Sequence, residues 1–256
     1  MCGILGLISK SYDKDCFISN LNRLAHRGPD GFGVWEDNGC ILGHRRLSII
    51  DISDNGKQPM EVVDRYVITF NGEVFNYLEI KRELESTGIK FKSKSDTEVL
   101  LYAYLQWGID CLSKLNGMWS FAIWDKVLRV LFLARDRVGE KPLFYLDQPE
   151  RFVFSSEMKS LYNYCQDFQL NNEVVGLVKD NVFKYESTNQ CLVKEINRFP
   201  AGSYGFYRAP QQRSTHCPTL PSTPLFLFLL SIFHSGLSRT CDRIEHSQPH
   251  QRLSWT

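Results

Sequence analysis

The chain begins Met1-Cys2-Gly3-Ile4-Leu5-Gly6-Leu7-Ile8, in which an apolar run that predicts a buried strand directly follows a cysteine. Removal of the initiator methionine would leave Cys2 with a thiol and an α-amine whose unperturbed pKa is about 8, which suits the amine to act as base for its own side chain. Gly3 is small enough to let a substrate and oxyanion donors approach. The stretch predicts a rigidly held nucleophile, and the alternative is an ordinary cysteine in a frayed terminus.

The bulk composition is that of a soluble globular protein. The 256 residues are 43% hydrophobic and 23% charged, which suits one large domain or two small ones. A formal net charge of +1 favours neither nucleic acid nor a membrane surface as a partner. Without a basic segment followed by an apolar one at the N-terminus, we expect a cytoplasmic location. The eight cysteines show no Cys-x-x-Cys spacing, so we expect neither a metal site nor a disulfide framework.

Short apolar patterns alternate with turns and with a few helical blocks. Helices are predicted over 15–25, 76–87 and 97–107, and from Glu157 onward, the third capped by Ser95 or Asp96. The stretch from there to about Lys194 is poorly patterned. Strands are predicted over 4–8, 33–35, 40–44, 66–70, 119–125, 130–136, 143–145 and 152–156. This arrangement predicts an α+β fold of layered antiparallel sheets covered by helices.

The composition changes abruptly after Tyr207. Residues 209–256 contain five of the ten prolines and four of the six histidines but no lysine. Leu225–Phe233 is apolar but too short to span a bilayer. We therefore expect one domain over 1–207 and a disordered tail over 208–256, which is also what a frameshift or a mis-joined exon would produce.

Several residues have the chemistry that an amide-hydrolysing site needs. Asn71 and Gly72 follow a predicted strand and could donate a side-chain and a backbone N–H to a tetrahedral oxyanion. Arg46 can hold a carboxylate with two hydrogen bonds, and Asp96 and Glu73 could bind an α-ammonium. Each residue alone is also common on a surface, in a turn or at a helix start, so the interpretation depends on their occurring together.

Taken together, the chain resembles the class II glutamine amidotransferase domain of glutamine-dependent asparagine synthetases. Nine motifs match in order over residues 1 to about 207, which makes the resemblance specific. They are Met1–Ile4, His26–Gly31, Arg46–Asp51, Asn71–Asn76, Ser95–Glu98, Leu115–Met118, Ala134–Gly139, Ser155–Lys159 and Phe199–Gly202. The resemblance implies an N-terminal-nucleophile hydrolase fold, an αββα sandwich of two antiparallel sheets between helix layers.

The resemblance also implies roles for the candidate residues. It makes Cys2 the nucleophile and Asn71 with Gly72 the oxyanion hole. It makes Arg46 the partner of the glutamine α-carboxylate, and Asp96 with Glu73 the partners of its α-ammonium. The glutamine pocket would also be lined by Leu47, Ser48, Ile49 and Ile50. The implied reaction is hydrolysis of L-glutamine to glutamate and ammonia through a γ-glutamyl thioester on Cys2.

The chain departs from the family pattern where a synthetase domain should begin. The phosphate loop Ser-Gly-Gly-x-Asp-Ser does not occur, and the nearest string is Ser235-Gly236-Leu237-Ser238. ATP and Mg would belong to that missing domain, so we expect no cofactor in this chain. Two alternatives stay open: an amidotransferase domain for a sugar or cell-surface precursor, and a catalytically idle partner of a full-length synthetase.

Overall fold

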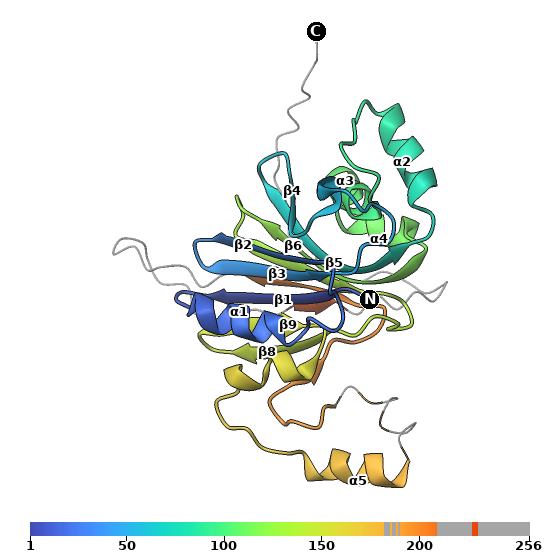
Figure 1. Ribbon diagram of the computed structural model, residues 1–256. Helices are drawn as coiled ribbons and strands as arrows, with labels where there is room; N and C mark the ends of the chain where they lie inside the picture. The colour runs from blue at the N-terminus through green and yellow to red at the C-terminus, as the bar shows by residue number, and fades with distance from the viewer. Residues whose placement is uncertain (182–184, 186–187, 189, 209–226, 230–256) are drawn as a thin grey trace, which may run out of the picture.

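Two six-stranded antiparallel sheets form the centre of the computed structural model, which describes residues 1–181, 185, 188, 190–208 and 227–229 (Figure 1). In spatial order the first sheet contains β10 (Asn197–Arg198), β8 (Phe144–Gln148), β9 (Arg151–Ser155), β1 (Gly3–Ser9), β3 (Cys40–Arg46) and β2 (Gly31–Asp37). The second contains β12 (Leu227–Leu229), β11 (Tyr204–Arg208), β7 (Val130–Arg135), β6 (Gly117–Asp125), β5 (Tyr66–Val74) and β4 (Met60–Val62).

The strand β1 lies inside the first sheet, between β9 and β3, and all seven of its residues are buried. A strand with neighbours on both sides and covered faces needs apolar residues throughout, which explains the unbroken run after Cys2. The predicted strand over 4–8 is therefore confirmed. Its pairing with β3 sets Gly3 opposite Arg45, so the start of the chain meets the end of β3.

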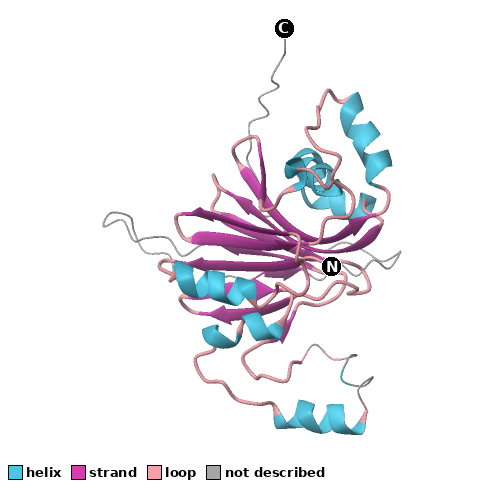
Figure 2. Cartoon of the chain, in the orientation of Figure 1, coloured by secondary structure: helices cyan, strands magenta, loops and turns pink. Residues whose placement is uncertain are grey.

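Most helices cover the outer faces of the two sheets, whereas the helix over Asn172–Asp180 lies away from them (Figure 2). The α-helices are α1 (Lys14–Asn22), α2 (Tyr77–Ser86), α3 (Asp96–Trp107), α4 (Cys111–Lys114) and α5 (Asn172–Asp180), and the 3-10 turns are η1 (Asp54–Gly56), η2 (Gly108–Asp110), η3 (Met158–Ser160) and η4 (Tyr162–Tyr164). Ser95 caps α3 by accepting a hydrogen bond from the Thr97 N–H, as predicted. Among the described residues no helix is long and apolar enough to cross a membrane.

Three groups of buried side chains hold the layers together. Leu42, Trp124 and Phe152 belong to the group that fills the space between the sheets. A second group joins the outer face of the second sheet to α2 and α3, and a third joins the first sheet to α1 and the turns after β9. This is the αββα sandwich that the family resemblance implies.

One prediction for the segment after β9 needs correction, and one helix there was not predicted. The helix predicted from Glu157 is wrong, because Glu157 has extended backbone and the turns η3 and η4 follow it. The Glu157 carboxylate accepts hydrogen bonds from His26 and Arg27, which holds this residue against the turn after α1. The poorly patterned stretch that follows contains α5, capped by the Asn171 side chain.

The predicted tail is described only in part. Leu227–Leu229 form β12 and pair with β11, although the sequence analysis predicted no element there. Residues 209–226 and 230–256 lie outside the described residues. The domain boundary at 207 and the character of the tail stay predictions.

Candidate functional site

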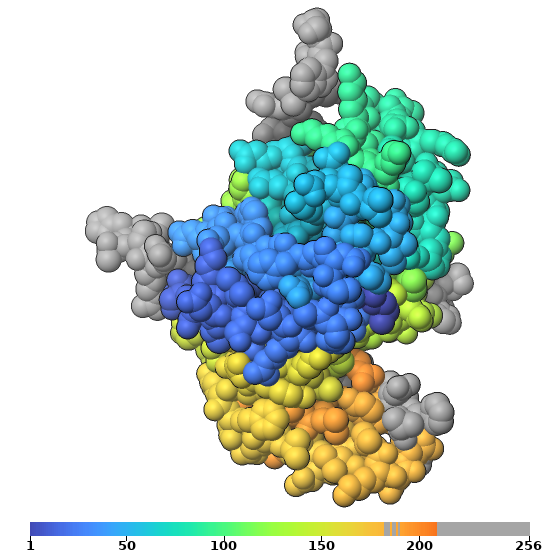
Figure 3. Space-filling model, in the orientation of Figure 1, coloured from blue at the N-terminus to red at the C-terminus, as the bar shows by residue number. Residues whose placement is uncertain are grey.

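A cavity of about 240 Å³ lies beside Cys2, where the chain enters β1. Every residue predicted for the site lines this cavity: Cys2, Arg46, Leu47, Ser48, Ile49, Ile50, Asn71, Gly72, Glu73 and Asp96. Figure 3 shows the segments from the first part of the chain, in blue, across the middle of this face of the molecule. The fold thus gathers residues that are up to 94 positions apart in the sequence, from Cys2 to Asp96.

The Cys2 thiol contacts the backbone of Leu47, just after β3. Its Sγ donates to the Leu47 carbonyl at 3.7 Å and accepts from the Leu47 N–H at 3.4 Å. Burial raises the pKa of the Cys2 thiol above its usual value, although the hydrogen bond to Leu47 opposes this. A thiol in this environment keeps its proton at neutral pH, so the site needs a base to generate a thiolate.

The backbone of Cys2 is fixed by residues to which the sequence analysis assigned no role. Arg27 donates from Nε to the Cys2 carbonyl at 2.9 Å and from a terminal nitrogen to the Glu157 carboxylate at 3.0 Å. The next strand residue, Ile4, donates its N–H to the Ser156 hydroxyl at 3.0 Å. The sequence analysis named the motifs that contain these residues: Arg27, Ser156 and Glu157. Their contacts with the start of the chain could not be predicted, because those contacts depend on how the strands pair.

Asn71 is fully buried in β5, and neither its amide nitrogen nor its oxygen has a hydrogen-bond partner among the described residues. An unsatisfied buried amide costs about 1–3 kcal/mol, and such groups often mark a site that awaits a ligand. The sequence analysis expected the strand to end before Asn71, but β5 continues to Val74 and pairs Asn71 with Ser120. The unpartnered amide is therefore held by a central strand rather than by a loop.

The structure gives a packing reason for the glycine at position 72. A Cβ on Gly72 would lie 2.2 Å from the Met118 carbonyl oxygen and 2.7 Å from Trp119 Cα on the neighbouring strand β6. These are backbone atoms that cannot move aside. Close contact between β5 and β6 therefore requires the glycine whatever the cavity contains.

Arg46 ends β3, and its guanidinium lies in the cavity wall. It donates to the Ser53 carbonyl at 3.1 Å and to the Asp51 carbonyl, so two of its five N–H donors hold the following loop. Asp51 in turn accepts from the Ser53 hydroxyl at 2.6 Å and from the Lys94 N–H at 2.9 Å. Arg46 and Asp51 thereby connect the loop 47–53 to the cavity and to the segment before α3.

Asp96, the first residue of α3, is the acid of the cavity whose pKa is raised. Burial raises the pKa of its carboxyl from 3.8 to about 6, the Val74 N–H opposes this with a hydrogen bond of 3.0 Å, and the nearby Glu73 charge raises the pKa further. No cation pairs with Asp96 in the described part of the chain. A bound α-ammonium would stabilise its ionised form.

The buried side chain of Gln58 connects strand β5, in the cavity wall, to helix α3. The Gln58 side-chain oxygen accepts from the Phe70 N–H at 2.7 Å, and its nitrogen donates to the Thr97 hydroxyl at 3.0 Å. Gln58 therefore fixes the distance between β5, which contains Asn71, and α3, which contains Asp96. The described residues contain no group of three or more His, Cys, Asp or Glu side chains placed to hold a metal ion.

The sandwich agrees with comparisons against known proteins. Residues 1–217 match the model of the glutamine amidotransferase domain family. The chain belongs to this family. It is a glutamine amidotransferase domain, and the fold and enzyme class predicted from the sequence are confirmed.

Curated relatives of this glutamine amidotransferase domain are asparagine synthetases. It is 42% identical over 204 residues to asparagine synthetase [glutamine-hydrolyzing] 1 of Bacillus subtilis, covering 77% of this chain and 32% of that one. It is 40% identical over 168 residues to asparagine synthetase [glutamine-hydrolyzing] 3 of the same organism, covering 63% and 27%. A putative asparagine synthetase of Methanocaldococcus jannaschii is 32% identical over 251 residues, covering 83% and 48%. The chain thus spans between about a quarter and a half of the length of these relatives.

Solved structures confirm the architecture. Glutamine phosphoribosylpyrophosphate amidotransferase from B. subtilis, in complex with ADP and GMP, superposes with a TM-score of 0.60 at 20% identity, covering 80% of this chain and 47% of that one. A structure of the allosteric regulatory enzyme of purine biosynthesis superposes with a TM-score of 0.59 and the same identity. At this identity the likeness shows the fold alone.

Proposed function

We propose that this domain hydrolyses L-glutamine to glutamate and ammonia through a γ-glutamyl thioester on Cys2. The observation that supports this most strongly is the unpartnered, fully buried Asn71 amide in the same cavity as the Cys2 thiol. A carboxamide whose carbonyl becomes an oxyanion would supply the acceptor that Asn71 lacks.

Each step of the reaction has a group in the cavity. After removal of Met1, the Cys2 amine takes the thiol proton, and the thiolate attacks the side-chain amide carbon of glutamine. The Asn71 amide and the Gly72 N–H stabilise the tetrahedral oxyanion. Its collapse breaks the C–N bond, the amine returns the proton to the leaving nitrogen, and ammonia departs. Water then attacks the thioester, with the amine again as base, and releases glutamate.

We assign recognition of the α-carboxylate and α-ammonium of glutamine to oppositely charged side chains in the cavity wall. The Arg46 guanidinium would bind the α-carboxylate, and Asp96 with Glu73 would bind the α-ammonium. The backbone of Leu47–Ile50 would border the substrate. An ammonium beside Asp96 would restore the ionised carboxylate that burial disfavours.

We further propose that the ammonia serves asparagine synthesis in the cytoplasm. The asparagine synthetase relatives at 32–42% identity support this acceptor. ATP, Mg and activated aspartate would be bound by a synthetase domain, in the same chain or in a partner. The similarity to phosphoribosylpyrophosphate amidotransferase concerns the fold and does not favour a sugar acceptor.

The test is a glutaminase assay of the untagged protein, with removal of Met1 verified by intact mass. Cys2→Ala should abolish ammonia release, and an uncleaved N-terminal tag should do the same because it converts the amine into an amide. Cys16→Ala, in α1 and outside the cavity, is the matched control and should retain activity. Equal ammonia release from tagged and untagged protein would contradict the proposed base.

A further inference from the structure

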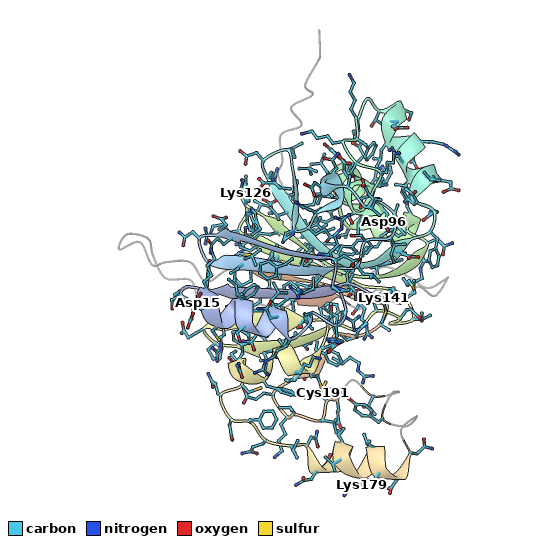
Figure 4. The ribbon with its side chains drawn as sticks, in the orientation of Figure 1. Asp15, Asp96, Lys126, Lys141, Lys179 and Cys191 are labelled. Atoms are coloured by element: carbon cyan, nitrogen blue, oxygen red, sulfur yellow. The ribbon has the colours of Figure 1, made fainter. Side chains whose placement is uncertain are left out.

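Lys141 is a buried cation in the wall of the glutamine cavity, and the proposed mechanism leaves it without a role. The residue is 5% exposed, and it lines the cavity together with Met1 and Cys2. Figure 4 places Lys141 at the same end of the sandwich as Asp96, beside the chain start labelled in Figure 1. No acidic side chain lies within ion-pair distance of its Nζ among the described residues. A buried ammonium without an anion is costly, so its position calls for an explanation.

The acceptor of the Lys141 ammonium is the Sδ atom of Met1, at 3.3 Å. A thioether is a weak acceptor, and this one belongs to the residue that the proposed mechanism requires to be removed. Once Met1 is gone, the ammonium loses that contact. The new α-amine of Cys2 then lies next to the space that Met1 occupied.

The loop that presents Lys141 is fixed by two buried charged side chains. The Arg135 guanidinium donates to the carbonyls of Gly139 at 2.6 Å, Lys141 at 2.7 Å and Phe199 at 2.6 Å. The Asp136 carboxylate accepts the N–H groups of Trp119, Val138, Glu140 and Lys141 at 2.8–3.2 Å. Such a network leaves the backbone at Lys141 little freedom, so the point from which the side chain enters the cavity wall is fixed.

We propose that the Lys141 ammonium is a positioning residue that keeps the α-amine of mature Cys2 in its neutral, proton-accepting form by like-charge repulsion. The inference rests on the proposed function, in which this amine is the base. An amine with its ordinary affinity for protons would be substantially protonated at pH 7 and unable to take the thiol proton. A fixed positive charge nearby makes protonation less favourable and increases the fraction of enzyme that is ready to react.

The other charges around Cys2 either add to this effect or oppose it. Arg46 also lines the cavity, and its hydrogen bonds to loop carbonyls leave its positive charge in place, so its effect on Cys2 adds to that of Lys141. Arg27 donates to the Cys2 carbonyl, and Glu157 offsets its charge. The remaining charged groups of the wall are acids that would favour a protonated amine: Asp51, Glu73 and Asp96.

The first experiment is the pH profile of kcat/KM for glutamine hydrolysis by the mature protein. Lys141→Met should move the acidic limb up by about one pH unit, the size that Coulomb's law gives for like charges about 10 Å apart at an effective dielectric of about 20. Activity should fall about tenfold at pH 7 and recover by pH 9. Lys141→Arg should keep the wild-type limb, and so should Lys179→Met, which removes an exposed lysine on α5.

A second measurement needs no activity. In a Cys2→Ser background, the rate at which acetic anhydride acylates the α-amine at position 2 is followed against pH by mass spectrometry. Adding Lys141→Met should shift this profile upward by the same amount, and Lys141→Gln replaces it if the methionine variant does not melt cooperatively. An unshifted amine profile would overturn the role of Lys141 and leave glutamine hydrolysis standing. Absence of glutamine hydrolysis by the wild type at every pH would instead reject the proposed function.

Discussion

The two walls of the glutamine cavity differ in how firmly they are held. The inner wall contains Asn71, Asp96 and Lys141, all buried and anchored in strands, a helix or the loop after β7. The outer wall is the loop 47–53, in which Ile49 is 62% and Ile52 82% exposed. Groups that stabilise developing charge must not move, whereas groups that admit a substrate must. We infer that the inner wall performs the chemistry and that the outer wall controls access.

The largest effect should come from the inner wall. Asn71→Ala removes one oxyanion donor and should lower kcat by about 10²–10³-fold with little change in KM, because this contact strengthens only as charge develops. Steady-state kinetics of ammonia release measures both constants. A raised KM with an unchanged kcat would place Asn71 in substrate binding instead.

A smaller effect is expected from Asp96, and it depends on pH. Glutamine needs the ionised carboxylate, so its affinity should fall as the pH drops through about 6, the raised pKa of Asp96. Calorimetry with Cys2→Ala, which binds without turnover, measures this directly. Asp96→Asn should weaken binding by about 10–100-fold, as loss of a hydrogen bond to a charged group does. It should also abolish the pH dependence.

The raised pKa of Asp96 also predicts how the stability of the folded protein depends on pH. The folded protein holds the Asp96 proton more tightly than the unfolded chain, so this group contributes stability at low pH that is lost as the pH rises through about 6. Asp96→Asn should therefore raise the melting temperature at pH 8 but not at pH 4. A variant that melts lower than wild type at pH 8 would show that the ionised carboxylate stabilises the empty site.

At the end of β3, where the outer wall begins, Arg46→Lys should raise KM about tenfold and change kcat little, because the carboxylate contact is the same in ground and transition states. It should also loosen the loop, since the Asp51 and Ser53 carbonyls lose their donor. Faster proteolysis within 47–53, compared with wild type, would report this. Equal KM effects from Arg46→Lys and Asn71→Ala would remove the distinction between the walls.

The smallest effect should follow Ile52→Ser. The side chain is exposed in the empty protein, so the melting temperature should stay within about a degree or two of wild type, as surface substitutions usually do. Thermal melting with and without glutamine measures this. A large loss of stability would show that Ile52 packs against something in the free domain.

The sequence predicted which residues form the inner wall better than it predicted how they are arranged. Asn71, Gly72 and Asp96 were identifiable because strand and helix patterns end or begin beside them, and Ser95 is a recognisable cap. The contact between Cys2 and Leu47 was not, because it depends on the register that pairs Gly3 with Arg45. The packing reason for a glycine at position 72 could not be predicted either, because the neighbouring strand β6 is far away in sequence.

Lys141 shows a second limit of sequence reasoning. The Ala134–Gly139 segment was identified as a motif, but Lys141 lies just beyond it. Its position becomes clear only when Arg135 is seen to bind its carbonyl and Asp136 its N–H. The helix predicted from Glu157 failed for a similar reason, since its extended backbone is set by partners in another segment. Local patterns predict elements, whereas long-range partners decide how loops present their side chains.

The central claim is that Cys2, with a free α-amine, forms a covalent intermediate with glutamine. The direct test is acid quenching of protein mixed with glutamine, followed by intact-mass and peptide mass spectrometry of mature protein and of protein that retains Met1. We predict a γ-glutamyl adduct on the Cys2 peptide of the mature protein and none on the Met1-retaining form or on Cys2→Ala. An adduct on another cysteine, or equal labelling with and without Met1, would contradict the account.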